Sequence, residues 1–325
     1  MGKDAENAAL KHPPRTTKAP ETAYLAGTIS SFAEVIRMRV GYIGLGNMGG
    51  PMSAHLAPGG FETTVFDLSG AALEAAVATG ANAAASPFDV GASSEIVCIC
   101  VQTDAQVRSV IVGDGEGTGV LAGLSEGGVI LIHSTVSPET IEAMHAAAEQ
   151  HGCSVVDAAV TGGAAGAKAG ELVFMVGGED ETIERIRPVL DVSSKLVIHA
   201  GPRGSGVKLK LVVNLFQYIH FAAVREAFAL AEVTGLDHED LIAATRANGH
   251  LSDGEMQFVG SARLPQDTQL PEEVQAFMKT QLITAEKDLG HALDQARAAG
   301  LALPTASVVS AGMARIYRVD DASRR

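Results

Sequence analysis

Short apolar runs rich in β-branched residues alternate with alanine-rich helical stretches from Met38 to about Ala200. The pattern predicts strands at 39–43, 63–66, 96–101, 129–133, 154–156, 172–176 and 195–198. Helical stretches lie between them, such as those at 70–79, 138–151 and 180–190. Apolar strands separated by helices are typical of a parallel sheet that is covered on both faces. We therefore expect a doubly wound α/β domain over residues 38–200.

The pattern changes after the glycine-rich segment 201–206. Residues 207–234 contain no proline and carry one long helical signal, which Gly235 ends. Further helices are expected at 238–248, 271–300 and 305–317. The second half is thus predicted to be an all-helical C-terminal domain over residues 201–317, with 201–206 as the hinge and 318–325 as a tail.

The first 37 residues show no sustained period and contain the pair Pro13-Pro14. Their basic start is not followed by the clean apolar run that a signal peptide needs. We expect a flexible N-terminal extension over residues 1–37, or sequence translated from a start upstream of Met38.

Composition and charge narrow the classes of protein further. Hydrophobic residues make up 46% and charged residues 19%, which excludes wholesale disorder. Lys and Arg number 24 against 38 Asp and Glu, and the resulting net charge of −14 disfavours a nucleic-acid partner. We find no run of about 18 apolar residues, so no membrane span is expected. The three cysteines form no even framework, so we expect reduced thiols, a cytoplasmic location and no metal site.

A G-x-G-x-x-G motif directly follows the first expected strand and opens a helix; it reads Gly44, Leu45, Gly46, Asn47, Met48, Gly49. In such a motif the first glycine permits a tight turn, the second lets a diphosphate approach the backbone, and the third lets helix and strand pack closely. Amides at the helix start then face the negative charge. We therefore expect a Rossmann-type domain that binds a dinucleotide here; the competing interpretation is an ordinary tight turn.

Asp67 stands at the end of the next expected strand, 23 residues beyond Gly44. A carboxylate at this point accepts hydrogen bonds from the ribose hydroxyls of NAD and repels the 2′-phosphate of NADP. No Lys or Arg occurs between Asp67 and Arg108 that would neutralise such a phosphate. We expect NAD as the cofactor, with NADP less favoured; alternatively, Asp67 caps the following helix.

Two further segments place polar groups at strand ends, where sheets of this kind bind ligands. Ser134 and Thr135 supply hydroxyls in one of them, although Ser137 in the same segment is also a helix cap ahead of a proline. In the other, Thr161, Gly162 and Gly163 offer a hydroxyl and two bare amides. Such a group suits a carboxylate, and a plain loop has the same sequence.

Lys210 and Asn214 lie four residues apart near the start of the long helix, so both project from one face. Burial and a positive nicotinamide ring lower the pKa of a lysine below about 10.4. Such a lysine can exchange a proton with a substrate hydroxyl, while Asn214 holds the lysine or the hydroxyl in place. A solvated helix face is the competing interpretation. Lys208 lies about 200° around the helix from Lys210 and cannot share its role.

These segments, in this order, resemble the β-hydroxyacid dehydrogenase family (3-hydroxyisobutyrate dehydrogenase-like) from Met38 to about Tyr317. The resemblance rests on five motifs: GYIGLGNMGGPM at 41–52, HSTVSP at 133–138, DAAVTGGAAGAKAGELVFMVGG at 157–178, GPRGSGVKLKLVVN at 201–214, and EKDLGHAL at 286–293. Five motifs at compatible spacing are far more specific than any one of them.

The resemblance implies a role for each matched residue. Lys210 is the catalytic acid/base, and Asn214 is its hydrogen-bonding partner. The substrate carboxylate is held by Ser134, Thr161, Gly162 and Gly163. The resemblance also implies cofactor contacts from Val101, Gln102, Gln106 and Thr135, with Lys287 reaching the nicotinamide side. Without the resemblance, Lys287 reads as a surface lysine beside Asp288.

The chain departs from the family pattern at several positions. Gln102 and Ala159 occupy positions that are usually proline, and Thr161 replaces the usual serine while keeping a hydroxyl. Val207 and Val213 replace a glutamine and an asparagine of the helix motif. Residues 251–280 match little of the family pattern.

Together these features predict an oxidoreductase that transfers a hydride between NAD and a small 3-hydroxy acid to give the semialdehyde. The alternatives are a semialdehyde or imine reductase on the same scaffold, or a non-catalytic NAD-binding protein. A helical domain built on one long helix readily buries its apolar faces against a second copy, so we also expect a homo-oligomer.

Overall fold

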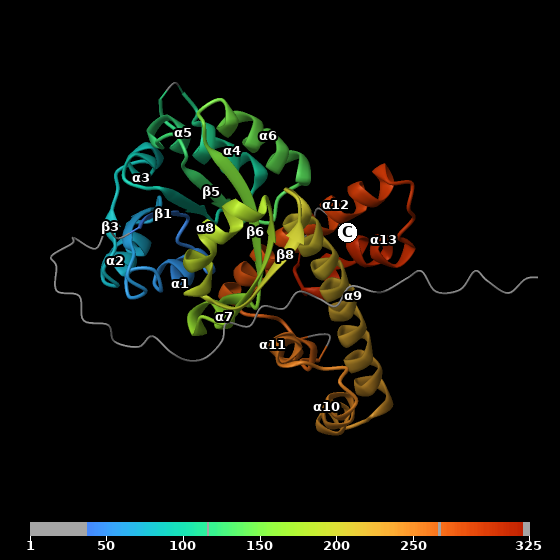
Figure 1. Cartoon of the computed structure of the whole chain (residues 1–325). Helices are drawn as coiled ribbons and strands as arrows, with labels where there is room; N and C mark the ends of the chain where they lie inside the picture. Colours follow the sequence, from blue (N-terminus) through green and yellow to red (C-terminus); the bar gives the residue numbers. More distant parts are fainter. Residues whose placement is uncertain (1–37, 116, 266–267, 321–325) are drawn as a thin grey trace, which may run out of the picture. The chain divides into compact units, whose positions relative to one another are not determined.

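A computed structural model of the chain describes residues 38–115, 117–265 and 268–320 (Figure 1). The extension expected at 1–37 and most of the expected tail, 321–325, lie outside the described residues. The described residues belong to one compact unit.

One sheet of eight strands organises the first half of the described chain, in the order β3-β2-β1-β4-β5-β6-β7-β8. The strands are β1 (Arg39–Ile43), β2 (Glu62–Phe66), β3 (Asn82–Ala83), β4 (Ile96–Ile99), β5 (Val129–Ile132), β6 (Ser154–Thr161), β7 (Leu172–Gly177) and β8 (Ser194–Gly201). The order reverses between β1 and β4, which is where doubly wound sheets open a crevice for a ligand. The sheet thus confirms the predicted Rossmann-type architecture.

Helices cover both faces of this sheet (Figure 1). They are α1 (Gly49–Ser53), α2 (Gly70–Val77), α3 (Pro87–Ala92), α4 (Asp104–Val112), α5 (Val120–Gly123), α6 (Pro138–Glu149), α7 (Gly163–Ala169) and α8 (Asp180–Asp191). Successive side chains of β5 point alternately into two hydrophobic cores, one on each face of the sheet. Leu131 packs with α1 and α8, whereas Ile130 and Ile132 pack with α4, α5 and α6. Burial of both faces explains why the strands read as continuous apolar runs.

The strand pair β6 and β7 departs from the parallel pattern, because it is antiparallel. The connection between the two strands, residues 162–171, is shorter than the dozen or so residues that a parallel crossover needs. Pairing with β7 also extends β6 to Thr161, well beyond the predicted end at residue 156.

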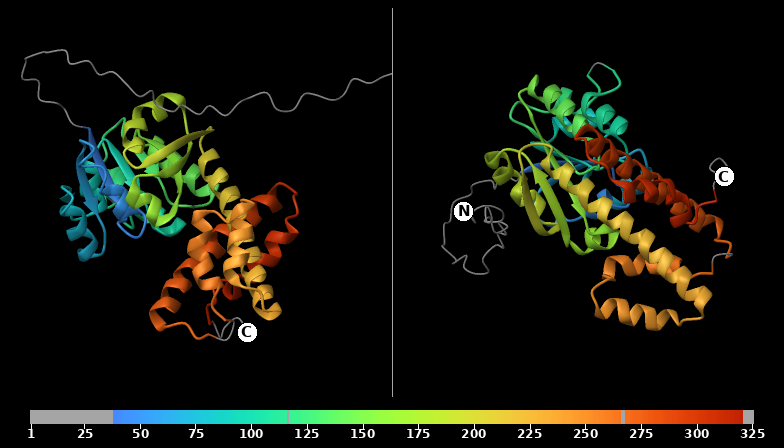
Figure 2. Two further views of the ribbon diagram at one scale, coloured as in Figure 1. Left: turned by 90° about the horizontal axis from the view of Figure 1, so that it is seen from below. Right: turned by 90° about the vertical axis from the view of Figure 1, so that its right-hand side faces the viewer.

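The second half of the described chain is helical, as predicted. It contains α9 (Ser205–Thr234), α10 (His238–Ala247), α11 (Asp253–Ala262), α12 (Glu272–Ala298), α13 (Pro304–Ala311) and α14 (Met313–Ile316). The long helix α9 leads away from the sheet with α12 packed beside it (Figure 2). The single helix predicted at 305–317 is broken at Gly312, which ends α13 and caps α14. The predicted division between residues 200 and 201 stays a prediction, since α9 also packs against β6, β7 and β8.

A buried carboxylate fixes the start of α9. Asp157 on β6 is 1% exposed. Its Oδ1 accepts from the amide of Gly204 at 2.7 Å, and its Oδ2 accepts from the amide of Val207 at 2.7 Å. The approach is close, because a Cβ at Gly206 would lie 2.4 Å from the carbonyl oxygen of Met175. The glycine-rich segment that the sequence marks as a hinge is therefore a tightly packed helix start, capped from the sheet.

Helix α9 corrects the expectation that no segment is apolar enough to cross a membrane. Over 18 of its residues the mean hydropathy is 1.3, so by length and composition it passes as a span. The same helix carries Arg225, which is 5% exposed and donates to the carbonyl oxygens of Ser261 and Ile316. Phe228 and Leu211 are buried on it as well. Part of its apolar surface thus packs against the sheet and the other helices, while other apolar side chains such as Phe216 are exposed.

Replacing Asp157 by asparagine tests the cap on α9. An asparagine offers one acceptor oxygen in place of two, so one buried amide of α9 loses its partner. We expect Asp157→Asn to lower the free energy of unfolding by about 1–3 kcal/mol, measured by urea denaturation. Asp180→Asn is the matched control, because the Asp180 side chain is 88% exposed at the start of α8. Equal stability of the two variants would contradict the capping role.

Candidate active site

The expected cofactor and substrate segments lie at one edge of the sheet. They follow the carboxyl ends of β1, β2, β4, β5 and β6, and the adjacent strands of this set run parallel. The segments are 44–49, Asp67, 101–102, 134–135 and 161–163. The fold therefore gathers residues that are more than a hundred positions apart in the sequence.

The three glycines of the loop have the different surroundings that the motif predicts. Gly44 has a φ of +91°, and a Cβ there would lie 2.3 Å from the carbonyl oxygen of Cys100. A Cβ at Gly49 would lie 1.9 Å from the carbonyl oxygen of Gly44. At Gly46, by contrast, a Cβ would meet no atom within 4 Å. The loop thus packs tightly against the sheet and leaves its backbone open at Gly46, which fits the diphosphate of a dinucleotide.

The remaining loop residues differ in exposure. Leu45 is buried in the core, Met48 is half-buried, and Asn47 is exposed. The helix that follows is short: α1 ends at Ser53, and the chain continues through turns to Gly60.

Asp67 is fastened to the glycine loop. Its Oδ2 accepts from the amide of Leu45 at 2.6 Å, and its Oδ1 accepts from the amide of Ser69 at 2.7 Å. Ser69, rather than Asp67, provides the side-chain cap of α2. The carboxylate therefore lies beside the loop, where a ribose would be met, and its part in choosing NAD over NADP stays a prediction.

The loops after β4 and β5 are joined by Ser134, which is 5% exposed. Its Oγ accepts from the amide of Val101 at 2.9 Å, which leaves its hydroxyl hydrogen free to donate to a ligand. The Gln106 side chain accepts from the amides of Gln102 and Thr103, so its Oε1 is used to cap α4. Ser137 caps α6 ahead of Pro138, as the capping interpretation held.

Lys210 is buried near the start of α9, with 8% of its surface exposed. The pKa of its amine is lowered to about 8, chiefly by burial; the negative charge of Asp288 opposes this shift, and the positive charge of Lys287 adds to it. At that value the amine exchanges a proton readily near neutral pH. Lys208 is exposed, in line with its position on another face of the helix.

A carboxylate that sequence reasoning missed lies at the centre of this region. Asp288 on α12 is 2% exposed, and its Oδ2 accepts from Nδ2 of Asn214 at 2.6 Å and from the hydroxyl of Tyr218 at 3.1 Å. Its Oδ1 accepts from Nζ of Lys287 at 2.8 Å, and the same Nζ donates to the carbonyl oxygen of Thr135. The one available signal was that Tyr218 follows Asn214 by four residues and so shares its helix face.

Helix α12 is tied to the sheet domain at a second point. Nε2 of His291 lies 3.2 Å from Oδ2 of Asp104 on α4, and Oδ1 of Asp104 accepts from the amide of Ser137. These hydrogen bonds hold the pKa of Asp104 well below its usual range, against the opposing effect of burial. The loop 134–137 is therefore fastened to α12 through both Lys287 and His291.

The last predicted substrate loop lies one strand further along the same edge. Gly162 and Gly163 have φ values of +128° and +63°, and Gly163 leaves open space around its backbone. Thr161 is half-buried at the end of β6. Contact of these residues with a carboxylate stays a prediction.

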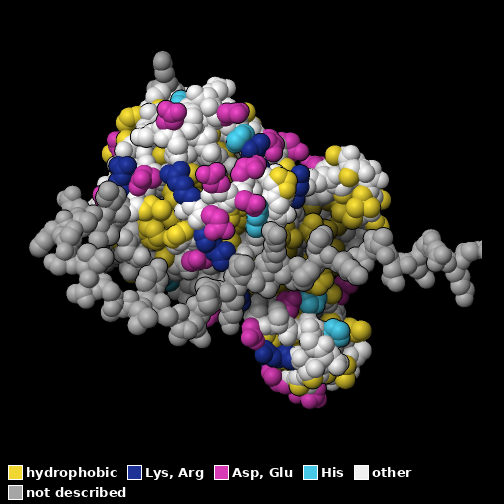
Figure 3. Space-filling model, viewed as in Figure 1, with side chains coloured by type: hydrophobic (Ala, Val, Ile, Leu, Met, Phe, Trp, Pro, Cys, Tyr) yellow, Lys and Arg dark blue, Asp and Glu magenta, His cyan; other side chains and the backbone are white. Residues whose placement is uncertain are grey.

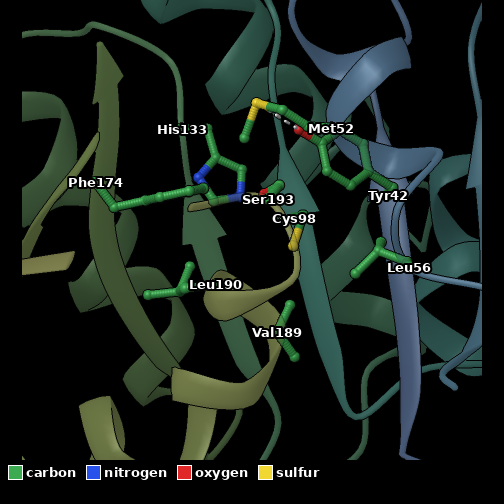
Figure 4. Close-up of a pocket in the computed structure, with 9 residues that line it drawn as sticks. All are labelled: Tyr42, Met52, Leu56, Cys98, His133, Phe174, Val189, Leu190 and Ser193. Atoms are coloured by element: carbon green, nitrogen blue, oxygen red, sulfur yellow. Dashed lines mark hydrogen bonds between the residues drawn. The ribbon is translucent and has the colours of Figure 1, made fainter. Parts of the chain in front are cut away.

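A small cavity beneath the sheet is separate from this edge. It has a volume of about 10 Å³, the space of a single water molecule, and is too small for a substrate. His133 points into it between Tyr42 and Phe174, and its Nδ1 donates to the carbonyl oxygen of Ala158 at 2.8 Å (Figure 4). Burial lowers the pKa of His133 to about 4, so the ring is neutral and serves the core.

Two family models match the chain, one over each half. Residues 39–201 match the NAD binding domain of 6-phosphogluconate dehydrogenase. Residues 204–324 match a domain described as the NAD-binding of NADP-dependent 3-hydroxyisobutyrate dehydrogenase. The two matches together cover most of the chain.

Individual proteins extend this similarity. An uncharacterized oxidoreductase of Mycobacterium tuberculosis is 44% identical over 201 residues, which are 61% of this chain and 66% of that protein, slightly less than two thirds of its length. A probable 3-hydroxyisobutyrate dehydrogenase of the same organism is 34% identical over 274 residues, 82% of this chain and 88% of the relative.

A solved structure adds to these relatives. The structure of Mycobacterium tuberculosis 3-hydroxyisobutyrate dehydrogenase with L-serine covers 87% of this chain and 94% of its own, with a TM-score of 0.71 and 29% identity. Fold, glycine loop and family matches lead to one assignment: the chain belongs to the β-hydroxyacid dehydrogenase family, the NAD(P)-linked oxidoreductases of the 3-hydroxyisobutyrate dehydrogenase type.

Proposed function

We propose that the chain oxidises a small 3-hydroxy acid to its semialdehyde with NAD, and catalyses the reverse reduction. The observation that carries the proposal is the buried amine of Lys210, which interacts with Asp288 and Lys287, and Lys287 in turn donates to the carbonyl oxygen of Thr135 in the loop after β5. A lysine with a pKa lowered to about 8 acts as a base or an acid close to neutral pH.

The reaction breaks the C–H bond of the carbinol carbon and the O–H bond of its hydroxyl, and forms a carbonyl. Bound NAD supplies the hydride acceptor. Neutral Lys210 takes the hydroxyl proton during oxidation, and its ammonium form returns that proton during reduction. The hydroxyl of Ser134 and the backbone amides at 162–163 hold the substrate carboxylate, which fixes the carbinol carbon between the lysine and the cofactor.

The substrate class follows from this arrangement and from the names of relatives. A related structure holds L-serine, which has a carboxylate and, on its β-carbon, a hydroxyl. An imine reductase on the same scaffold remains the competing proposal, and Lys210 favours the hydroxy acid because oxidation of a hydroxyl requires a base. We propose that the cofactor is NAD rather than NADP, because the carboxylate of Asp67 beside the glycine loop would repel a 2′-phosphate.

Assembly and location are proposed on separate grounds. Large apolar side chains are exposed along α9, among them Phe216 at 71% and Val233 at 79%. Hydrophobic side chains also gather over the surface formed by α12 and α13, where Val308 is 75% exposed (Figure 3). Such surfaces suit a homo-oligomer. We also propose, from the free cysteines, that the chain is cytoplasmic.

An activity screen tests the proposed function. Purified protein is assayed at 340 nm with NAD and with NADP against 3-hydroxyisobutyrate, 3-hydroxypropionate, glycerate, 4-hydroxybutyrate and L-serine. We expect turnover of at least one 3-hydroxy acid, with a higher kcat/KM for NAD than for NADP because of Asp67. Turnover of imines alone, or binding of NADH without any turnover, would instead support one of the competing functions.

Removal of the Lys210 amine tests the proposed acid/base. Loss of positioned proton transfer costs about 10²–10⁴-fold in rate, so we expect a fall of this size in kcat for Lys210→Ala. Binding of NADH, followed by its fluorescence, should persist. Lys208→Ala is the matched control, because Lys208 lies exposed on another face of the same helix turn. If Lys210→Ala turned over like the control, Lys210 would have no part in the chemistry.

A further inference from the structure

Asp288 is a buried acid whose carboxylate is surrounded by polar partners. It lies in the middle of α12 between Leu282 and Ala292, which are buried as well. A carboxylate there is costly unless its oxygens are fully used. Three donors satisfy it: the amide of Asn214, the hydroxyl of Tyr218 and the ammonium of Lys287. Its partners on α9 are 70 or more residues away in the sequence.

The hydrogen bond from Asn214 fixes which way its amide faces. A carboxylate can only accept, so the nitrogen of the Asn214 amide must face Asp288. The Oδ1 atom of Asn214 is then directed away from Asp288. On α9, Lys210 precedes Asn214 by one helical turn on the same face. An Oδ1 held in this way is an acceptor for the amine of Lys210 or for a substrate hydroxyl.

The second oxygen of Asp288 reaches the sheet domain through Lys287. The ammonium of Lys287 is shared between Oδ1 of Asp288 and the carbonyl oxygen of Thr135, in the loop that follows β5. That loop also contains Ser134, whose hydroxyl joins the loop after β4. One carboxylate therefore links the helix that carries the base with the loops that line the crevice.

We propose that Asp288 is the positioning residue of the reaction: it orients the Asn214 amide beside Lys210 and, through Lys287, fastens the Thr135 loop to the same point. Its kinetic consequences rest on the proposed function, whereas its hydrogen bonds do not. Asp288 touches neither substrate nor cofactor in this scheme, and it acts through its neighbours.

The charges around Lys210 allow the proposal to be tested through the pKa of this lysine. Asp288 is faced by Lys210 and Tyr218 from α9, by Lys287 from its own helix and by Tyr317 from the end of α14. Burial raises the pKa of both tyrosines, so neither carries a charge near neutral pH. Asp288 raises the pKa of Lys210 and Lys287 lowers it. Removing one charge or the other should therefore move this pKa in opposite directions.

The test compares Asp288→Asn and Lys287→Met with the wild-type chain, using the pH dependence of kcat for hydroxy-acid oxidation. Oxidation needs neutral Lys210, so the rate rises with pH through the pKa of this lysine. We expect Asp288→Asn to move that rise downward and Lys287→Met to move it upward, each by about one pH unit. We also expect kcat of Asp288→Asn to fall by about 10–100-fold, because a small displacement of the reacting groups costs that much.

Asp294→Asn serves as the control on the same helix, because its side chain is 69% exposed and pairs with the exposed Arg297. It should leave both kcat and the pH profile unchanged. A merely structural Asp288 would lower the amount of folded enzyme, as judged by circular dichroism, without moving the profile of the active fraction. If Asp288→Asn does not fold, Lys287→Met still tests the proposal. A pH profile of kcat that is unchanged or moved to lower pH in Lys287→Met would overturn it.

A second readout does not depend on turnover. Competitive acetylation of Lys210 with acetic anhydride, followed by peptide mass spectrometry across a pH series, reports the pKa of this amine directly. Opposite shifts in the two variants support the Asp288 network even if no hydroxy acid is oxidised, in which case the proposed function alone fails. Shifts in the same direction, or none, would overturn the role of Asp288 while leaving the activity screen to judge the proposed function.

Discussion

Burial of an amine beside a carboxylate is the arrangement on which the site depends. Lys210 and Asp288 are 8% and 2% exposed, and charged groups in such positions are costly unless they are paired and hydrogen-bonded. Here the cost yields two chemical properties. Burial lowers the pKa of the amine to about 8, and the carboxylate holds Asn214 and Lys287 in fixed directions. A solvent-exposed lysine would not have a lowered pKa, and a solvent-exposed carboxylate would not hold its partners in fixed directions.

The fold delivers Lys210 to this point through the start of α9. Asp157 in the sheet fixes the amides of Gly204 and Val207, and Lys210 follows Val207 by about one helical turn. Position and direction of the amine are thus set by a cap from the sheet rather than by the helical bundle alone. Helix α12 then brings Asp288 and Lys287 against the same turn, and His291 ties α12 to Asp104. Two distant parts of the chain therefore meet: α9 is bonded to Asp157 on β6 and to Asp288, and α12 is bonded to Thr135 and Asp104.

Much of this could be predicted from the sequence, because local patterns carry it. Apolar runs located seven of the eight strands, while β3 was missed because it spans only Asn82 and Ala83 and has no run of its own. The glycine motif and its context predicted the tight loop that follows β1, where the strand order reverses. The end of β6 was misjudged because Asp157 interrupts the apolar pattern, and its reason for being buried lies in an amide 50 residues away.

Asp288 shows the limit of reading the sequence. Next to Lys287 it resembles any exposed charge pair, and only contacts with α9 explain its burial. Long-range hydrogen bonds leave no periodic trace, so a residue that acts by holding others escapes such an analysis. The antiparallel pairing of β6 and β7 was missed for a similar reason, since it depends on the length of one connection.

The central claim is that the Lys210 amine meets the substrate hydroxyl across the crevice from the cofactor. The most direct measurement is a crystal structure of the chain with NADH and a 3-hydroxy acid that it oxidises. We expect Nζ of Lys210 to lie about 2.6–3.2 Å from the hydroxyl oxygen, with the Asn214 amide still bonded to Asp288. A ternary complex in which the hydroxyl is bound by other groups, with Lys210 turned away from it, would contradict the claim.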